Sequence, residues 1–298
     1  MVTLSYDLVF VGNVAFDEIH PFRGEAHTLF GSAVYVAAMA AAWSDKRIAL
    51  VTRMAERDTQ LLEPLRKVGI AVHVSPSAET TYHRGSFPSE NVDERQINLV
   101  RSAGPFTMAD LPAMEPTFIN LASVTNQDFT LDFIRALRSR GFTLAVDMQS
   151  FVRHVDKQTG RVSFADVASK QEIARIARAV KLDVIEAGHV TGTTDLEQAA
   201  VQFERWGTSE TMATRADGVL VRHAGQSYFE RFTNKNSEGR TGRGDTVFAS
   251  YLVRRMDHSV SDSLRFAAAL TSIKMETPGP FTGTLDDVLD RMNRDYPS

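Results

Sequence analysis

Two patterns of apolar and polar residues alternate along most of the chain: short apolar runs and longer stretches with helical periodicity. The apolar runs predict strands at residues 6–12, 46–52, 117–121, 143–147, 182–186 and 217–222, and a hairpin at residues 225–229. The amphipathic stretches predict helices at residues 31–43, 58–68, 128–139, 166–180 and 195–206, and further helices from about residues 245, 261 and 285. Repeated strand–helix units are typical of a mostly parallel sheet with helices on both faces.

Residues 72–104 interrupt this pattern. Polar and apolar residues alternate there with period two, most clearly at residues 80–83 and 96–100. The alternation predicts half-buried antiparallel strands. Such strands, inserted into an α/β chain, are expected to form a lid over an active site, and lids exclude water from the reaction.

The composition of the chain argues against several classes of protein. The 298 residues are 43% hydrophobic and carry a net charge of −4, with scattered Lys and Arg, so no nucleic-acid interface is predicted. The longest apolar run, residues 33–43, is too short to cross a membrane, and no signal peptide is recognised. The absence of Cys excludes disulfides and thiolate metal sites, and the scattered His residues match no zinc motif. A cytoplasmic location is expected.

A glycine-rich turn at residues 238–246 precedes one of the predicted helices. Glycines let backbone N–H groups approach a ligand, and the start of a helix adds free N–H donors and positive dipole character, so the turn suits a phosphate group. Asp245 is predicted at or beside the N-cap of that helix. The spacing alone also fits an ordinary capping Asp.

Two features near the N-terminus suggest a ligand site. Asp17 follows the first predicted strand, and ligands of open α/β sheets bind beyond the carboxyl ends of strands. Asp17 is therefore placed to accept hydrogen bonds from a polyhydroxylated ligand, although a turn-capping Asp is the alternative. Gly31 and Ser32 open a helix of small residues and can present backbone N–H groups.

In this order, the motifs resemble those of the ribokinase-like (PfkB) family of carbohydrate kinases over essentially the whole chain. The family's C-terminal motif is matched by residues 241–246 (TGRGDT), and its N-terminal Gly-Gly motif is matched less well by residues 31–33 (GSA). Residues 146–153, 238–245 and 278–281 are most similar to the branch that includes myo-inositol kinase-like proteins.

The resemblance implies one domain, residues 1–298, folded as a three-layer α/β/α sandwich with a mostly parallel central sheet. It also implies a small β lid from about residues 13–30 and 72–104. The implied reaction is ATP-dependent phosphorylation of a hydroxyl of a sugar or polyol, either inositol-like or a pentose or hexose, with Mg²⁺ accompanying ATP. Exposed lid edges would allow a homodimer.

The resemblance also assigns roles to residues. Asp245 would be the general base, and the backbone N–H groups of Gly242, Arg243 and Gly244 would stabilise the transferred phosphoryl group. The residues implied to bind the substrate are Asp17, Gly31, Ser32 and Tyr35. Those implied on the nucleotide side are Thr214, Gly239, Thr241 and Gly242.

Four departures from the family pattern bear on function. Ser32 replaces a glycine, and Tyr35 and Val36 stand where an Asn is expected, which leaves substrate choice open. Arg243 replaces a small residue and would either reach the ATP phosphates or point to solvent or a structural ion pair. The usual Asn-x-x-Glu pattern is not found after residues 182–186, so the metal ligand is unknown and Glu186 is a weak candidate.

Two other functions remain open from the sequence. A nucleoside kinase would use Phe16, Phe22, Phe30 and Tyr35 to stack a base. A ligand-binding protein that keeps the kinase fold but has weakened catalysis is the alternative outside the enzymes.

Overall fold

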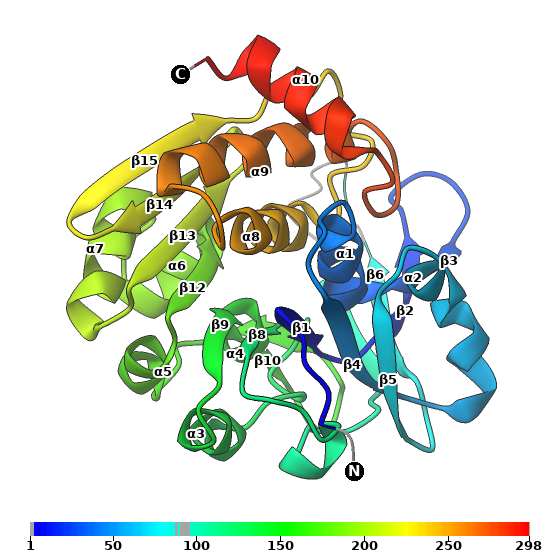
Figure 1. Ribbon diagram of the computed structural model, residues 1–298. Coiled ribbons are helices and arrows are strands. Elements are labelled where there is room, and N and C mark those ends of the chain that lie inside the picture. The colour runs from blue at the N-terminus through cyan, green and yellow to red at the C-terminus, as the bar shows by residue number, and fades with distance from the viewer. Residues whose placement is uncertain (1–2, 87–88, 90–95, 298) are drawn as a thin grey trace.

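The computed structural model describes residues 3–86, 89 and 96–297. Within these residues, a nine-stranded sheet crosses the centre of the molecule in the order β15-β14-β13-β12-β9-β8-β1-β4-β5 (Figure 1). Its strands are β1 (Leu8–Val11), β4 (Ile48–Met54), β5 (Ala71–Pro76), β8 (Phe118–Leu121), β9 (Thr143–Asp147), β12 (Ala179–Asp183), β13 (Glu210–Arg215), β14 (Gly218–His223) and β15 (Gln226–Arg231). The sheet is parallel from β5 to β13, and β14 and β15 continue it antiparallel.

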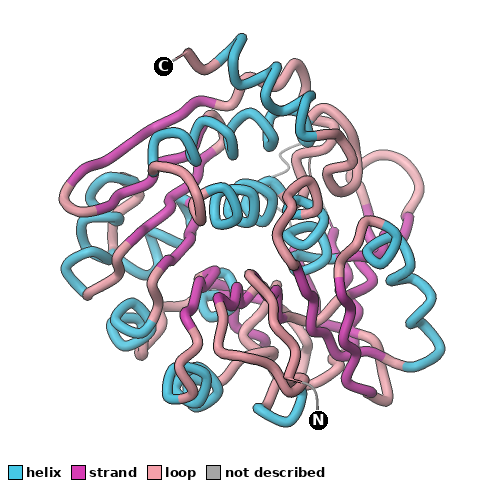
Figure 2. Tube along the Cα trace, viewed as in Figure 1, coloured by secondary structure: helices cyan, strands magenta, loops and turns pink. Residues whose placement is uncertain are grey.

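Helices cover both faces of this sheet (Figure 2). One face carries α1 (Ser32–Ala41), α2 (Glu63–Lys67), α8 (Arg243–Arg254), α9 (Val260–Met275) and α10 (Leu285–Asp295). The other carries α3 (Leu131–Ser139), α5 (Lys170–Ile176), α6 (Val184–Thr191) and α7 (Leu196–Trp206). Successive strand residues point to opposite faces, so Leu8 and Phe10 enter one core while Val9 and Val11 enter the other. The predicted three-layer α/β/α fold is confirmed.

A second, four-stranded sheet has the order β3-β2-β6-β7 among the described residues. Its strands are β2 (Ala15–His20), β3 (His27–Gly31), β6 (Thr81–Ser86) and β7 (Gln96–Arg101). The prediction that residues 72–76 belong to this accessory region is wrong, because β5 pairs with β4 in the central sheet. As an edge strand, β5 is only half buried, which explains its alternating pattern. Residues 87–88 and 90–95 of the predicted lid lie outside the described residues.

Two predicted elements have different boundaries. The helix predicted at residues 166–180 is only α5, and the strand predicted at residues 182–186 is β12, three residues earlier. The charge of Lys181 within the strand hid the apolar pattern, although its side chain is buried. The helix predicted at residues 58–68 divides into a 3₁₀ segment, Glu56–Leu62, and α2. Pro64 has no N–H to continue the helical hydrogen bonds there.

Several elements of the described chain were not predicted. One is β13, the strand of the central sheet that carries Thr214. Others are the short helix α4 (Gln149–Val152) and the two strands of a small hairpin, β10 (Arg153–Val155) and β11 (Val162–Phe164). Among the described helices, none has the length and apolar character needed to cross a membrane.

Candidate active site

The glycine-rich turn leads into α8, but Asp245 does not cap it. The helix begins at Arg243 and its N-cap is Gly242, so Asp245 is the third helical residue and not at or beside the N-cap as predicted. Gly242 has a φ of 82°, and a Cβ on it would lie 2.9 Å from a methyl carbon of Val36 in α1. The turn is thus packed against the helix that starts with the N-terminal motif.

Lys181 of β12 lies directly beneath the turn. A Cβ on Gly244 would lie 2.8 Å from the Lys181 ammonium, so only glycine fits there without moving the lysine. The same ammonium lies 3.0 and 3.2 Å from the carboxylate oxygens of Asp147, at the end of β9, and 3.9 Å from Glu186. Burial opposes the charge of Lys181, but the neighbouring carboxylates outweigh it and raise the pKa of Lys181.

Glu186 is part of this buried cluster and lies in a helix, not at the end of the strand predicted at residues 182–186. It lies in the first turn of α6, where one carboxylate oxygen accepts a hydrogen bond from Arg153 at 3.3 Å. The other accepts from the backbone N–H of Asp183 at 2.8 Å. Burial raises the pKa of Glu186 to about 7, although Lys181 opposes this shift. Asp183 and Glu186 form an Asp-x-x-Glu capping box, which the misplaced strand had concealed.

Asp245 shares the electrostatics of this cluster. Burial raises its pKa, while the positive charges of Lys181 and Arg153 partly oppose the shift. A carboxylate with a raised pKa accepts a proton more readily than an exposed Asp does. One of its oxygens, Oδ1, is buried and has no hydrogen-bond partner among the described residues. Asp245 is therefore suited to act as a base toward a bound hydroxyl.

The predicted substrate residues come together at the start of α1. Asp17 on β2 lies beside His83 on β6, with 3.1 Å between its Oδ1 and the His83 Nδ1. Gly31 ends β3, and Ser32 begins α1 with a φ of 72° and a buried, unpartnered hydroxyl within the described part of the chain. Tyr35 packs against Gly31, where a Cβ would lie 3.3 Å from the Tyr35 ring.

Of the residues predicted on the nucleotide side, Thr214 is the one that lies outside the turn. Thr214 is at the carboxyl end of β13, paired with Asp183, and its buried Oγ1 has no hydrogen-bond partner in the described ranges. Arg243 reaches toward the end of the same strand, where it donates to the Ala216 carbonyl at 3.4 Å and lies over the Phe232 ring. Arg243 does not simply extend into solvent.

Gly239 and Thr241 lie in the first half of the glycine-rich turn. Lys274 of α9 donates hydrogen bonds to the backbone carbonyls of both residues. Gly239 has no room for a side chain, because a Cβ there would lie 2.0 Å from the Thr277 carbonyl oxygen. Sequence reasoning missed Lys274, since it continues the face of an otherwise apolar helix, and also missed His83, whose register opposite Asp17 requires the strand pairing.

Several buried polar atoms around the turn have no hydrogen-bond partner among the described residues. They are Asp245 Oδ1, Ser32 Oγ, Thr214 Oγ1 and Arg153 Nε. Buried polar groups are nearly always hydrogen-bonded, and exceptions concentrate where a ligand or water completes the site. These atoms are available to a polar ligand placed between the start of α1 and the start of α8.

A metal site is not built from acidic side chains here. Within the described residues, no group of three or more His, Asp or Glu side chains is arranged to hold an ion. Glu186 and Asp147 are engaged by Arg153 and Lys181. The proposal that Glu186 helps to hold a metal ion stays untested.

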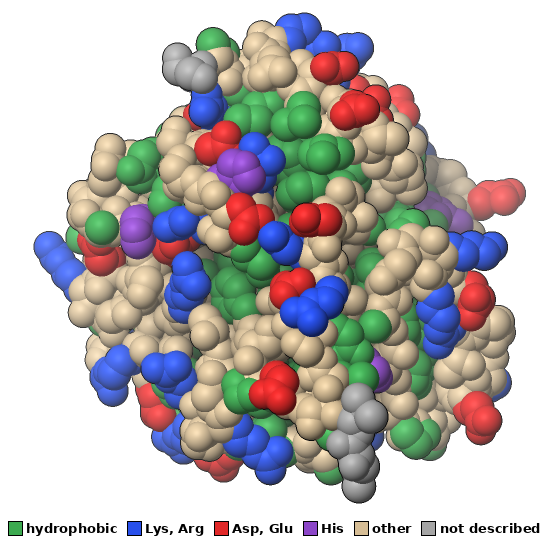
Figure 3. Space-filling view, in the orientation of Figure 1, with side chains coloured by type: hydrophobic (Ala, Val, Ile, Leu, Met, Phe, Trp, Pro, Cys, Tyr) green, Lys and Arg blue, Asp and Glu red, His purple; other side chains and the backbone are tan. Residues whose placement is uncertain are grey.

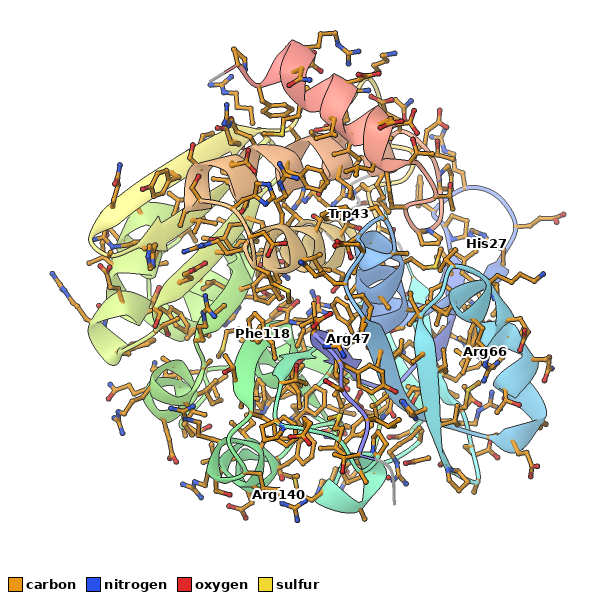
Figure 4. The ribbon with its side chains drawn as sticks, viewed as in Figure 1. His27, Trp43, Arg47, Arg66, Phe118 and Arg140 are labelled. Atoms are coloured by element: carbon orange, nitrogen blue, oxygen red, sulfur yellow. The ribbon has the colours of Figure 1, made fainter. Side chains whose placement is uncertain are left out.

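A second hollow lies at the opposite edge of the central sheet, at the amino ends of the strands. It has a volume of about 500 Å³, and Tyr6, Lys46, Phe118 and Arg178 are among its lining residues. Figure 4 labels Phe118 and Arg47 near this edge, and Figure 3 shows side chains of both charges on the same face. Its position separates it from the glycine-rich turn.

Comparison with known proteins gives matches among solved structures. No family model and no curated protein matches the chain. A pyrophosphate-dependent kinase in the ribokinase family, solved as a sulfate complex, is 29% identical, with a TM-score of 0.87 over 95% of this chain and 99% of its own. A pyrophosphate-dependent kinase in the same family, complexed with a pyrophosphate analogue and myo-inositol, is 28% identical, with a TM-score of 0.86 over 95% and 99%. Arabidopsis thaliana ribokinase with ribose and ATP is 17% identical, with a TM-score of 0.75 over 97% and 99%.

Ser32→Gly should stabilise the protein. A left-handed backbone conformation destabilises a non-glycine residue by about 1–2 kcal/mol. Glycine avoids this strain but loses about 0.5–1 kcal/mol more in conformational entropy on folding. We expect the free energy of unfolding in urea to rise by up to about 1 kcal/mol. Ala224→Gly, which relieves a φ of 49° in the β14–β15 turn, is the matched control and should give a similar gain. A loss of stability confined to Ser32→Gly would mean that its hydroxyl makes a stabilising contact.

Glu186→Gln should change how stability depends on pH. The pKa of Glu186 is about 7 in the folded protein against an ordinary value of 4.5, so between these values the folded state binds more protons than the unfolded state. The contribution of Glu186 to the free energy of unfolding therefore falls as pH rises from 4.5 to about 7 and is constant above that.

Urea denaturation of wild type and Glu186→Gln at pH 5 and pH 7.5 tests this linkage. The free energy of unfolding of Glu186→Gln, taken relative to that of wild type, should be higher at pH 7.5 than at pH 5. Glu115→Gln, a change at an exposed site, should leave the pH dependence unaltered. Parallel curves for wild type and Glu186→Gln would show that Glu186 is ionised throughout.

Proposed function

We propose that this chain, a carbohydrate kinase with the ribokinase-like fold, transfers a phosphoryl group from pyrophosphate to a hydroxyl of a cyclic polyol of the myo-inositol type. The observation that carries the proposal is the start of α8, where Asp245 has an unpartnered oxygen among the described residues and the ammonium groups of Lys181 and Lys274 lie against the glycine-rich turn. The likeness to pyrophosphate-dependent kinases at 28–29% identity supports the choice of donor.

The acceptor would lie between Asp17 and Asp245. His83 fixes one oxygen of the Asp17 carboxylate, and no second hydrogen bond to Asp17 is present within the described residues. The other oxygen can accept hydrogen bonds from the neighbouring hydroxyls of a polyol. The unpartnered Ser32 hydroxyl adds a donor and acceptor on the same side. An acceptor with hydroxyls around a whole ring would satisfy these groups better than one with a single hydroxyl.

The reaction would follow from the position of Asp245. Asp245 takes the proton of the acceptor hydroxyl as its oxygen attacks the terminal phosphorus of the donor, and the bond from phosphorus to the bridging oxygen breaks. Inorganic phosphate leaves if the donor is pyrophosphate, and ADP leaves if it is ATP. The N–H of Arg243 donates to the Arg240 carbonyl at 3.1 Å, which leaves the N–H groups of Gly242, Gly244 and Asp245 to stabilise the charge that develops on the phosphoryl oxygens.

The choice between pyrophosphate and ATP rests on how a donor can be held. ATP has a base and a ribose to bury, whereas pyrophosphate must obtain its binding energy from its charge. A site for pyrophosphate therefore needs cations close to the phosphoryl position. This chain places Arg240 and Arg243 in the turn itself, with Lys274 and Lys181 behind it. Mg²⁺ would arrive with the donor phosphates, because it prefers such oxygens and keeps several waters.

No observation favours the nucleoside kinase alternative. The rings of Phe16, Phe30 and Tyr35 pack on one another, with centroid separations of 5.2 and 5.9 Å. These rings contact one another at interplanar angles of 60° and 75°, and Phe22 lies beside Arg23. A homodimer through the four-stranded sheet stays a prediction.

Turnover assays with each donor test the proposal. Purified protein is given myo-inositol, other inositols, ribose, fructose or adenosine, with either pyrophosphate or ATP, and phosphorylated product is measured. We expect the highest kcat/KM for an inositol with pyrophosphate. Turnover with ATP alone would make the donor assignment wrong, and preference for ribose, fructose or adenosine would make the acceptor assignment wrong.

Asp245→Asn should abolish turnover and spare donor binding. Losing a general base typically costs about 10²–10⁴-fold in rate. Calorimetry with pyrophosphate should give nearly the wild-type affinity, since the phosphate contacts remain. Asp290→Asn, a matched change on the exposed face of α10, should leave both quantities unchanged. If Asp245→Asn lost donor binding but kept its kcat, Asp245 would be a structural residue of the turn.

A further inference from the structure

Lys274 occupies an unusual position for a lysine. It lies near the end of α9 and is only 3% exposed, on a helix whose other buried residues are mostly apolar. Its ammonium donates to the backbone carbonyls of Gly239 and Thr241, on either side of Arg240. These residues lead directly into Gly242, the N-cap of α8. Lys274 thus connects the C-terminal end of α9 to the glycine-rich turn.

The partners of Lys274 are dipoles and not carboxylates. The other buried lysine of the site, Lys181, has Asp147 at 3.0 Å, whereas no ion pair to Lys274 is found among the described residues. Buried lysines are almost always paired with acids, because an unpaired charge is costly to bury. Burial lowers the pKa of Lys274 to about 8, and the negative charge of Asp245, which forms no ion pair with Lys274 among the described residues, partly opposes this shift. The cost of burying this charge indicates that the Lys274 ammonium has a function at this position.

The direction of the two carbonyl groups suggests this function. In a planar trans peptide the C=O and the following N–H point in opposite directions, and the described chain has no cis peptide. Because the Thr241 carbonyl points at Lys274, the N–H of Gly242 points away from it. The N–H of Gly242 is one of those that would face the transferred phosphoryl group.

We propose that Lys274 is a positioning residue that acts as a tethered monovalent cation: its ammonium gathers the carbonyls of Gly239 and Thr241, and so aims the N–H groups of the turn at the phosphoryl group. Carbonyl oxygens arranged around one point also replace the hydration shell of K⁺ in proteins. Lys274 provides the same charge covalently. The role in turnover rests on the kinase reaction proposed above, whereas the cation-like contact is a property of the chain itself.

The proposal predicts that removing the side chain creates a site for a free cation. Lys274→Ala leaves a cavity beside the carbonyls of Gly239 and Thr241, which K⁺ or NH₄⁺ can enter. Lys274→Met fills the same space without charge and leaves no room for an ion. Lys170→Ala, the same truncation at a lysine that pairs with Asp166 far from the turn, serves as the control.

Kinetics in chloride salts of constant ionic strength test the role in turnover. With tetramethylammonium as the only cation besides Mg²⁺, Lys274→Ala should lose about 10²-fold in kcat, the scale of a misplaced catalytic geometry. Added K⁺ or NH₄⁺ should raise the kcat of Lys274→Ala at least about tenfold, with little change in the KM of the acceptor. Lys274→Met should stay inactive in every salt, and wild type and Lys170→Ala should be insensitive to the cation.

Thermal unfolding gives a second measurement that needs no substrate. K⁺ or NH₄⁺ should raise the Tm of Lys274→Ala and not that of wild type or Lys274→Met, since only a bound cation stabilises by mass action. This separates the proposal from the choice of donor and acceptor. It is overturned if Lys274→Ala keeps its kcat, if neither kcat nor Tm responds to K⁺ or NH₄⁺, or if wild type itself requires a monovalent cation.

Discussion

The buried ion pair between Lys181 and Asp147 is the constraint on which the carboxyl edge of the central sheet depends. Lys181 projects from β12 into the space beneath the turn, and this position is tolerable only because Asp147 and Glu186 lie within 4 Å of it. Removing one partner of such a pair typically costs about 3–5 kcal/mol, because a buried charge is left uncompensated. The lysine in turn requires glycine at residue 244, which lets the backbone of the turn approach the sheet. The buried ion pairs and the glycine-rich turn therefore depend on each other.

Two lysines support the turn from different sides and by different means. Lys181 contacts carboxylates, and its charge is largely balanced within the protein. Lys274 contacts carbonyl dipoles, which orient an ammonium without cancelling its charge. Both charges act on Asp245, and the effect of Lys181 on its pKa is larger than that of Lys274. An anionic donor would approach a surface that has partial positive charge from N–H groups and a full charge behind it.

Local patterns in the sequence predicted the parts of this site that lie on one continuous segment. Residues 241–246 and 31–33 could be recognised because their chemistry depends on glycines and a helix start, which are local properties. Glu186 was misplaced because Lys181 breaks the apolar pattern of β12, and a charged strand residue is buried only if Asp147 lies opposite it. His83 and Lys274 were missed for a similar reason. Their partners are 66 and 33 to 35 residues away, and only strand register or helix packing brings them together.

Arg243 illustrates how a departure from a family motif can carry information about the donor. A small residue at this position would leave the flank of the turn open, whereas Arg243 spans from the turn to the Ala216 carbonyl and the Phe232 ring. Its guanidinium thus covers the side where Thr214 lies, and a planar, permanently charged group there favours phosphate oxygens over an uncharged base or ribose. A donor that is all phosphate gains from this arrangement, while ATP gains only through its phosphates. If the donor is pyrophosphate, as proposed, Arg243 adds a contact to its phosphates and occupies space beside the turn that a base or ribose would need.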